Sequence, residues 1–294
     1  MMTGIPPYLL LVLSMSATLL GSCLRNRFGK SDGKSSANIS AFSLLTLLFV
    51  FFELLIMAES YACSLFTAAL GTLFGLLTLA GTIAGTQMLA CGPMGLSTVI
   101  VTSNMIVPAL SGAIIWHEQI SPLQGVGIVL MLVMLPLAVK GDRGRAISVP
   151  WLIHCAVGFL AGGVIGILQK IHQSSPFRQE SDAFLLIAFA VSVLGNAVLF
   201  LIGRKRGQRV TCSFSPRRQN FWLAAAVSVG VTLPNKINLY LSGAMDSAVF
   251  FPIVNGGGLL LSLLAAVLIF RERPTKRQWV GMAIGILAVL LLGL

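Results

Sequence analysis

Ten long apolar stretches separated by short polar gaps constrain the fold of this chain more than any other feature. They cover roughly residues 7–24, 39–58, 64–90, 93–116, 121–139, 150–169, 183–203, 220–242, 247–270 and 276–294. A helix that crosses a bilayer needs about 20 mostly apolar residues, whereas the strands of a membrane barrel are short and alternate in polarity. The sequence therefore predicts an all-α integral membrane protein with ten transmembrane helices.

The charge of the chain supports lipid as its solvent. Charged residues make up 10% of the sequence, against roughly 25% in soluble domains. The net charge of +11 is compatible with nucleic-acid binding in principle, but the basic residues fall in the gaps between apolar stretches. That distribution sets membrane topology and does not form a phosphate-binding face. No nucleic-acid partner is predicted.

The basic residues also predict the orientation of the chain. Of the 20 Lys and Arg residues, 17 lie in the gaps after the first, fifth, seventh and ninth stretches or at the very start of the tenth. Only Lys170 and Arg178 lie in the other gaps, and Lys236 lies deep inside a stretch. Loops rich in Lys and Arg stay in the cytoplasm. We therefore predict a multi-pass protein of the cell membrane with both termini outside.

One signature occurs twice at a separation of 154 positions. Each copy has a Glu, a Gln six residues later and a Gly three residues after that: Glu118, Gln124 and Gly127, then Glu272, Gln278 and Gly281. The loop of the second copy is basic, whereas the first contains no Lys or Arg. Internal repeats of opposite orientation are typical of secondary transporters. Two inverted five-helix repeats are predicted, residues 1–140 and 150–294.

With this doubled signature and the ten stretches, nearly the whole chain resembles the drug/metabolite transporter superfamily in its ten-helix EamA-type form. The resemblance implies a secondary transporter that works by alternating access, with its cavity between the two repeats. The segments 92–116 and 246–270 resemble the central helices of that family. The resemblance does not indicate a substrate, the direction of transport, the coupling ion or the oligomeric state.

Lys236 is the sharpest candidate for a functional residue. It lies about seven residues inside the predicted outer end of its stretch, about 10 Å deep at 1.5 Å per residue. Intramembrane charge is costly and commonly marks a functional site. We predict that Lys236, with the amide of Asn235 beside it and Pro234 before it, binds an anionic substrate group. The alternatives are a structural pair with Glu53 or extension to the membrane surface.

Polar residues also occur near the middle of the two stretches that resemble central helices. Asn255 precedes three glycines, and a shift of 154 places Thr102 and Asn104 near the corresponding point of the first repeat. Small residues at such positions commonly serve helix packing. For the two asparagines, substrate binding and structural hydrogen bonding are both open. We predict that Thr102, Asn104 and Asn255 line the substrate site.

Three further charged residues have simpler predicted roles. Glu53, about six residues inside its stretch, is a candidate proton or cation site. Glu118 is interpreted as a structural contact that fixes the turn into the next helix. Lys170 closes its stretch on the outer side, where a long side chain can extend to water.

No enzyme motif is present. The sequence lacks His-Glu-x-x-His, Gly-x-Ser-x-Gly and Walker-type patterns, and its five cysteines show no ligand spacing. No metal or cofactor is predicted. The predicted function is secondary transport of a small polar metabolite that carries an anionic group, with protons as the candidate coupling ion. The alternatives are efflux of organic cations or drugs, or a membrane scaffold or lipid-handling role.

Overall fold

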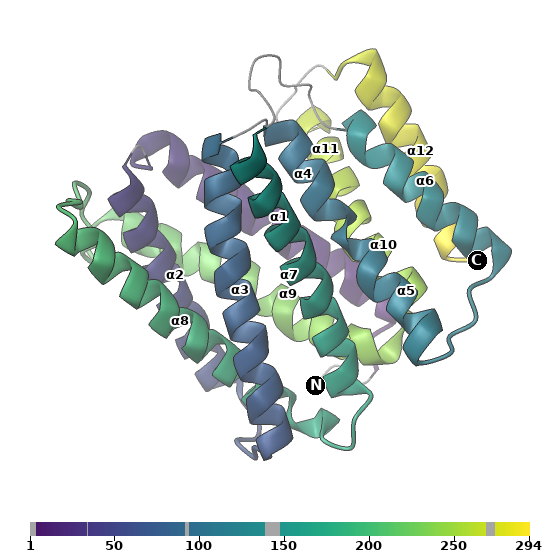
Figure 1. Ribbon diagram of the computed structural model, residues 1–294, viewed down its shortest axis with the longest axis horizontal. Helices are drawn as coiled ribbons and strands as arrows, with labels where there is room; N and C mark the ends of the chain where they lie inside the picture. The colour runs from purple at the N-terminus through teal and green to yellow at the C-terminus, as the bar shows by residue number, and fades with distance from the viewer. Residues whose placement is uncertain (1–3, 34, 92–93, 139–147, 269–273) are drawn as a thin grey trace. The chain divides into compact units, whose positions relative to one another are not determined.

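The structure of the chain is a computed structural model. It describes residues 4–33, 35–91, 94–138, 148–268 and 274–294, and in these ranges the regular secondary structure is helical, without strands. The α-helices are α1 (Pro7–Ser31), α2 (Ser36–Met57), α3 (Leu65–Cys91), α4 (Met94–Thr102), α5 (Ile106–Ile115), α6 (Pro122–Ala138), α7 (Val149–Gln173), α8 (Ser181–Lys205), α9 (Gln219–Ala244), α10 (Ser247–Pro252), α11 (Gly258–Leu268) and α12 (Lys276–Leu292) (Figure 1). Single turns of other helix types are η1 (Ser103–Met105), η2 (Arg178–Glu180) and the π-helical η3 (Ile253–Gly257).

Each of the ten predicted stretches is helical over most of its described residues, so the all-α prediction is confirmed. In the described part of the chain, seven helices are long and apolar enough to cross a membrane: Pro7–Ser31, Ser36–Met57, Leu65–Met88, Leu96–Ile115, Val149–Gln173, Arg178–Lys205 and Ser247–Ala265. α6 is apolar but has 17 residues, and α9 and α12 are not among the seven. That ten helices cross the bilayer stays a prediction.

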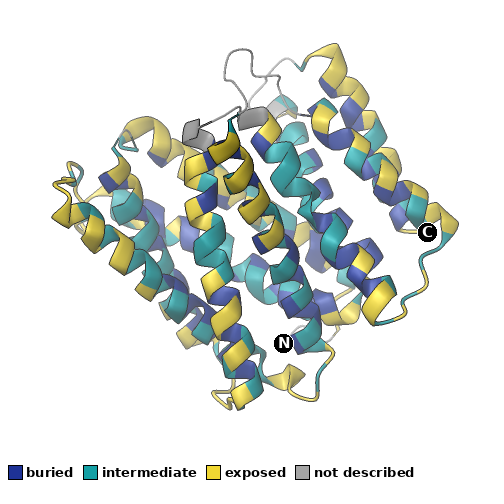
Figure 2. Ribbon diagram, viewed as in Figure 1, coloured by how far each residue is buried: buried dark blue, intermediate teal, exposed yellow. Residues whose placement is uncertain are grey.

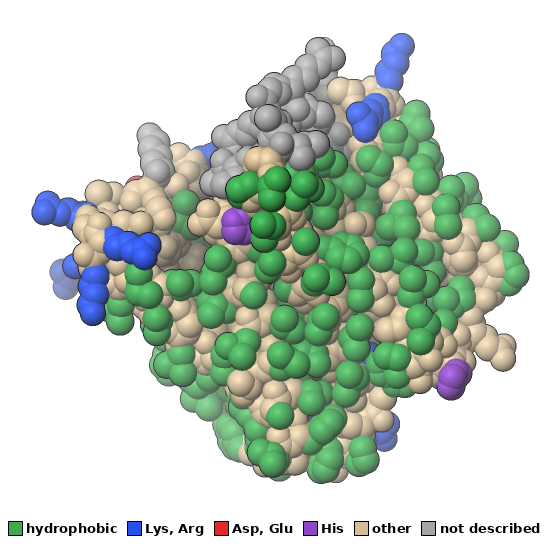
Figure 3. All heavy atoms as spheres, in the orientation of Figure 1, with side chains coloured by type: hydrophobic (Ala, Val, Ile, Leu, Met, Phe, Trp, Pro, Cys, Tyr) green, Lys and Arg blue, Asp and Glu red, His purple; other side chains and the backbone are tan. Residues whose placement is uncertain are grey.

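The exposed surface of the helices is itself apolar. In α2 the buried residues recur about every four positions, from Phe42 through Val50 to Leu54, and so form one stripe. On the opposite side Phe52 and Ile56 are exposed by 54% and 83%. A single helix therefore has both buried and exposed residues (Figure 2). Hydrophobic side chains cover much of the face seen in Figure 3. Soluble proteins rarely expose so much apolar surface, and this chain has the surface of a helical membrane protein.

The chain folds into two compact units, and both halves of the sequence contribute to each of them. Unit 1 contains Met1–Met15, Ala80–Ile171 and Leu241–Leu294, and unit 2 contains Ser16–Leu79 and His172–Tyr240. The predicted division into residues 1–140 and 150–294 follows a sequence repeat and is a different partition. That division stays a prediction.

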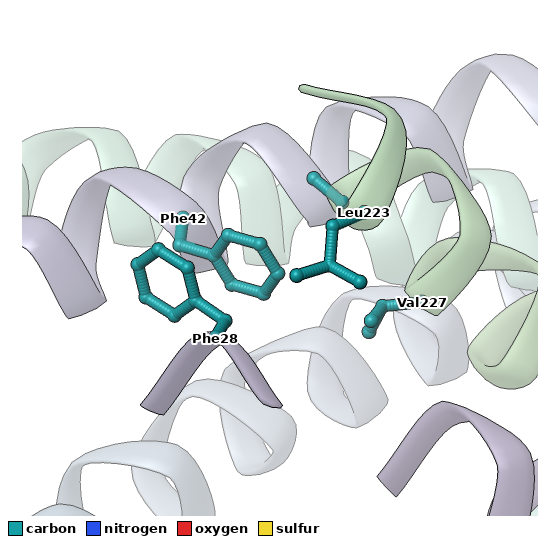
Figure 4. Packing of buried hydrophobic residues seen from close by; sticks show 5 residues of the cluster. Phe28, Phe42, Leu223 and Val227 are labelled. Atoms are coloured by element: carbon teal, nitrogen blue, oxygen red, sulfur yellow. The ribbon is translucent and has the colours of Figure 1, made fainter. Parts of the chain in front are cut away.

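Unit 2 has an aromatic core at one end of α2 and α9. The rings of Phe28 and Phe42 stack at a centroid distance of 3.9 Å, and both pack with Leu223 and Val227 of α9 (Figure 4). On α3, a Cβ atom at Gly75 would lie 2.5 Å from the carbonyl oxygen of Ala188. Glycine is needed there because the backbones of α3 and α8 approach so closely.

In unit 1 the doubled signature has a clear structural explanation. Gln278 forms a capping box with Thr275 at the start of α12, and Gln124 exchanges the same two hydrogen bonds with Ser121 before α6. Each box satisfies backbone N–H groups that a helix start leaves without partners. The signature therefore marks two helix starts built alike.

The glycine of each signature copy packs against the other helix of the α6–α12 pair. Gly127, near the start of α6, contacts Leu292 at the end of α12, and Gly281, near the start of α12, contacts Leu137 at the end of α6. The contacts are reciprocal, so the two helices pack antiparallel and side by side (Figure 1). Glu272, Arg271 and Phe270 of the second copy lie outside the described residues.

Candidate functional site

Two long helical segments of unit 1 are interrupted near their middle, and the residues explain why. Pro108 lacks the N–H that would donate to the carbonyl of Asn104, so the regular α-helical ladder is broken there. The chain forms η1 between α4 and α5. The second interruption, η3, directly follows Pro252 and contains two glycines with weak helix propensity. Turns of these types inside helices are frequent at functional sites.

The two interruptions lie against each other in unit 1. η1 carries Asn104, with Thr102 just before it, and η3 carries Asn255. All three side chains are partly exposed. The amide nitrogen of Asn255 donates to the carbonyl of Phe251 at 3.0 Å. Three of the predicted site residues are thus brought to one place, where irregular backbone and amide groups coincide.

Gly162 of α7 determines where the amide of Asn104 can lie. A Cβ atom at Gly162 would be 1.9 Å from Nδ2 of Asn104, well inside contact distance. The next glycine, Gly163, meets Val107 in the same way. α7 therefore offers a side-chain-free surface to η1 and the start of α5. Sequence reasoning missed this role of Gly162.

The other predicted site residues belong to unit 2, along the line where α2 meets α9. Both carboxylate oxygens of Glu53 are 2.5 Å from hydroxyl groups of α9, those of Ser228 and Thr232. One turn further along both helices, Nζ of Lys236 donates to the carbonyl of Met57 at 3.0 Å. Residues later in α2 contact residues later in α9, so the two helices run parallel.

Lys236 pairs with a residue that sequence reasoning did not select. Its Nζ lies 2.8 Å from Oδ1 of Asp182 at the start of α8, and the two side chains are 15% and 17% exposed. Oδ2 of Asp182 accepts from the backbone N–H of Glu59 at 2.9 Å. The alternative pair of Lys236 with Glu53 is wrong, because hydroxyl groups occupy Glu53. The ammonium group of Lys236 lies at the end of α2 and the start of α8, where Asp182 balances its charge.

Asn235, next to Lys236, bonds within its own helix. Its amide nitrogen donates to the carbonyl of Val231 at 2.8 Å. Val231 directly follows Gly230, whose carbonyl has no helical donor because Pro234 lacks an N–H. The predicted role of Asn235 in a substrate site stays a prediction.

A buried ion pair holds three segments of unit 1 together. Nζ of Lys170 lies 2.6 Å from Oε1 of Glu118, with the side chains 8% and 11% exposed, and it also donates to the carbonyl of Met245 at 3.1 Å. Oε2 of Glu118 accepts from the backbone N–H of Ser247 at 2.7 Å, at the start of α10. The prediction that Lys170 extends to water is wrong, because Glu118 supplies a buried counter-charge.

The local backbone explains how Glu118 reaches this position. His117 has a φ of 54°, in the left-handed region that few non-glycine residues adopt. The turn brings the N–H of Glu118 to the carbonyl of Gly112. A Cβ atom at Gly112 would be 2.2 Å from Oε2 of Glu118. The geometry agrees with the interpretation of Glu118 as a contact that fixes this turn.

A metal site requires several ligating side chains that converge on one point. Among the described residues no group of three or more His, Cys, Asp or Glu side chains converges. The chemistry that the two units offer is hydrogen bonding by amides, hydroxyls and the carboxyl group of Glu53, together with the charges of Lys236 and Asp182.

Comparisons with known proteins give the fold a parallel. No protein-family model matches the chain. An uncharacterized protein of Haemophilus influenzae (strain ATCC 51907 / DSM 11121 / KW20 / Rd) is 25% identical over an alignment of 196 residues, and the match covers 63% of this chain and 62% of that protein. A solved crystal structure of a protein matches 97% of this chain and 98% of its own, with a TM-score of 0.73 and 13% identity. The fold has a solved precedent. Function must be argued from the residues.

Proposed function

We propose that this chain is a secondary active transporter of the cell membrane, related to the EamA-type drug/metabolite transporters, with ten transmembrane helices in two inverted repeats. The observation that carries the proposal is the pair of interruptions η1 and η3, which lie against each other and present Asn104 and Asn255. Secondary transporters commonly build their substrate sites from discontinuous helices of two repeats. Irregular backbone is tolerated at membrane depth where it is buried in protein or lines a cavity.

The α6–α12 pair supports the repeat. Its reciprocal glycine contacts, with Gly127 against Leu292 and Gly281 against Leu137, are those expected of two copies of one helix related by a twofold axis. Similar capping boxes begin both helices. Alternating access in such folds proceeds by movement of one repeat against the other.

The proposed substrate is a small polar metabolite with an anionic group. In unit 1, the amides of Asn104 and Asn255 suit polar uncharged groups. In unit 2, Lys236 remains the candidate predicted from the sequence for an anionic group, and an anion there must compete with Asp182. Efflux of organic cations would require Glu53 to release its hydroxyl partners. A scaffold or lipid-handling protein would have no need of two facing polar interruptions.

The test of this proposal is a thermal-shift screen of the purified protein against a library of polar metabolites. A ligand at about 100 times its Kd stabilises the folded state by about 2.7 kcal/mol. Gly162→Ala should remove most of that stabilisation, because the new methyl group displaces the amide of Asn104. Gly125→Ala is the matched control, since a Cβ atom there meets nothing within 4 Å. Equal ligand responses in both variants would exclude η1 from the site.

Orientation gives a second test. We expect an impermeant maleimide to label the exposed Cys63 in intact cells. Cys212 is a poor cytoplasmic reporter, because burial, and after it Asp32, raises the pKa of its thiol and the thiolate is the reactive form. Ser213→Cys in a background with both Cys63→Ser and Cys212→Ser supplies an exposed replacement without the outer reporter. It should be labelled only after permeabilisation, and labelling in intact cells would reverse the predicted topology.

A further inference from the structure

Glu53 stands out among the charged groups of unit 2, because its carboxyl group meets two hydroxyls and forms no ion pair with a described residue. Oε1 lies 2.5 Å from Oγ of Ser228, and Oε2 lies 2.5 Å from Oγ1 of Thr232. Ser228 is fully buried and Thr232 nearly so, at 0% and 1% exposure. The group lies inside α2, four residues before its end at Met57.

The hydrogen atoms in this cluster can be counted. The hydroxyl of Ser228 carries one hydrogen, yet Oγ is 2.5 Å from Oε1 of Glu53 and 2.6 Å from the carbonyl oxygen of Ala225. A carbonyl oxygen supplies no hydrogen, and neither does an ionised carboxylate. With Glu53 ionised, one of these two short contacts would join bare oxygen atoms. With a proton on Oε1, Glu53 donates to Ser228, Ser228 donates to Ala225, and Thr232 donates to Oε2.

We propose that Glu53, Ser228 and Thr232 form an intramembrane proton-binding site, and that the geometry of this structure is its proton-loaded form. Binding adds one proton to Oε1 of the carboxylate and breaks no other bond. The inference rests on the proposed function only for its role in transport, where this proton is the coupling ion. Proton binding at this site does not depend on any substrate and can be tested without one.

The spacing of the oxygen atoms separates a proton from a metal ion. Oxygen ligands about 2.1 Å from a small octahedral cation lie about 3.0 Å apart, and a larger cation spreads them further. The 2.5 Å contacts of Glu53 are shorter than this and fit a shared hydrogen. These short contacts favour a proton as the ligand, and exchange of sodium for potassium tests the cation alternative.

Among the described residues of unit 2, no neighbouring charge forms an ion pair with Glu53. Lys236 of α9 is one turn from Thr232, and Asp182 of α8 neutralises it at 2.8 Å. The part of α3 in this unit, residues 65–79, has no charged residue. α1 packs against α9 where Gly21 meets Gly230, between Ser228 and Thr232, and the first basic residue of α1, Arg25, lies one turn beyond Gly21.

The test is pH-difference infrared spectroscopy of the purified protein in lipid, which records carboxylic acid groups directly. Raising the pH should remove a carboxylic acid band in the wild type, and this band should be absent from Glu53→Gln. The matched control Glu59→Gln changes an exposed glutamate and should keep the band. Ser228→Ala should shift the band, because the acid loses its acceptor. A Glu53→Gln spectrum identical to the wild type would overturn the site.

Two further measurements complete the design. Exchanging potassium for sodium at fixed pH should leave the band unchanged, and displacement by sodium would mean a cation site. Glu53→Gln should keep the wild-type unfolding temperature, because its amide can donate to Ser228 and accept from Thr232 as the protonated acid does. A large loss of stability would count against the proton-loaded assignment. No transport is measured, so failure of the proposed function alone leaves these results standing.

Discussion

Lys170→Met should lower the free energy of unfolding by about 3–5 kcal/mol, because it leaves the buried carboxylate of Glu118 without its counter-charge. The variant also removes the donor to the carbonyl of Met245. The measurement is reversible unfolding in mixed micelles with increasing denaturing detergent. Because the ligand screen requires folded protein, Lys170 is a position that should not be altered in variants used for that screen.

Two controls make that result specific. Lys205→Met removes the same charge at an exposed position on α8 and should change stability by less than about 0.5 kcal/mol. The double variant Lys170→Met with Glu118→Gln should recover much of the loss, because no unpaired charge remains buried. If Lys170→Met is as stable as Lys205→Met, the pair does not hold the three segments together.

Lys236→Ala should weaken binding of an anionic ligand by about 10- to 100-fold, since a hydrogen bond to a charged group contributes about 1.5–3 kcal/mol. Asp182→Asn is the informative counterpart. It retains an acceptor for the N–H of Glu59 but frees the charge of Lys236, so affinity for the same ligand should rise. Both affinities come from thermal-shift titrations with the ligand found in the screen.

The opposite signs expected for these two variants separate a binding role from a structural one. If the Lys236–Asp182 pair only holds α8 against α9, both variants lose stability and neither alters affinity for the anion. That outcome would remove Lys236 from the substrate site and shift weight to a cation as substrate. Because the pair is 15–17% exposed, its loss should cost less stability than the loss of Lys170.

The sequence was sufficient for the helices and for part of the site. Continuous apolar stretches require helices in lipid, so their positions were predicted to within a few residues at most ends. Pro252 and the glycines after Asn255 were visible signs of the second interruption. Pro108 was an equally clear sign of the first, by the same loss of a backbone donor. Thr102, Asn104 and Asn255 were selected for their polarity at mid-stretch.

Side-chain partners were the part that could not be predicted. Several carboxylates of the sequence were possible partners for Lys236. Its pairing with Asp182 depends on how α8 packs, and hydrophobic patterns do not specify that packing. Lys170 resembled a surface lysine because its partner, Glu118, is far away in sequence. One signal was available for Glu53: Ser228, Thr232 and Lys236 follow each other at intervals of four, which places them on one face of a helix.

The division of the chain into interleaved units has a consequence for its biosynthesis. Unit 2 requires Ser16–Leu79 together with His172–Tyr240, and unit 1 requires the last segment, Leu241–Leu294. A ribosome delivers helices to the membrane in order, so the early helices must wait in lipid for partners made much later. α2, for instance, must be held with Glu53 lacking Ser228 and Thr232 until α9 emerges. A nascent chain halted near residue 171 would contain neither unit complete, and the membrane quality-control machinery should recognise it as unfinished.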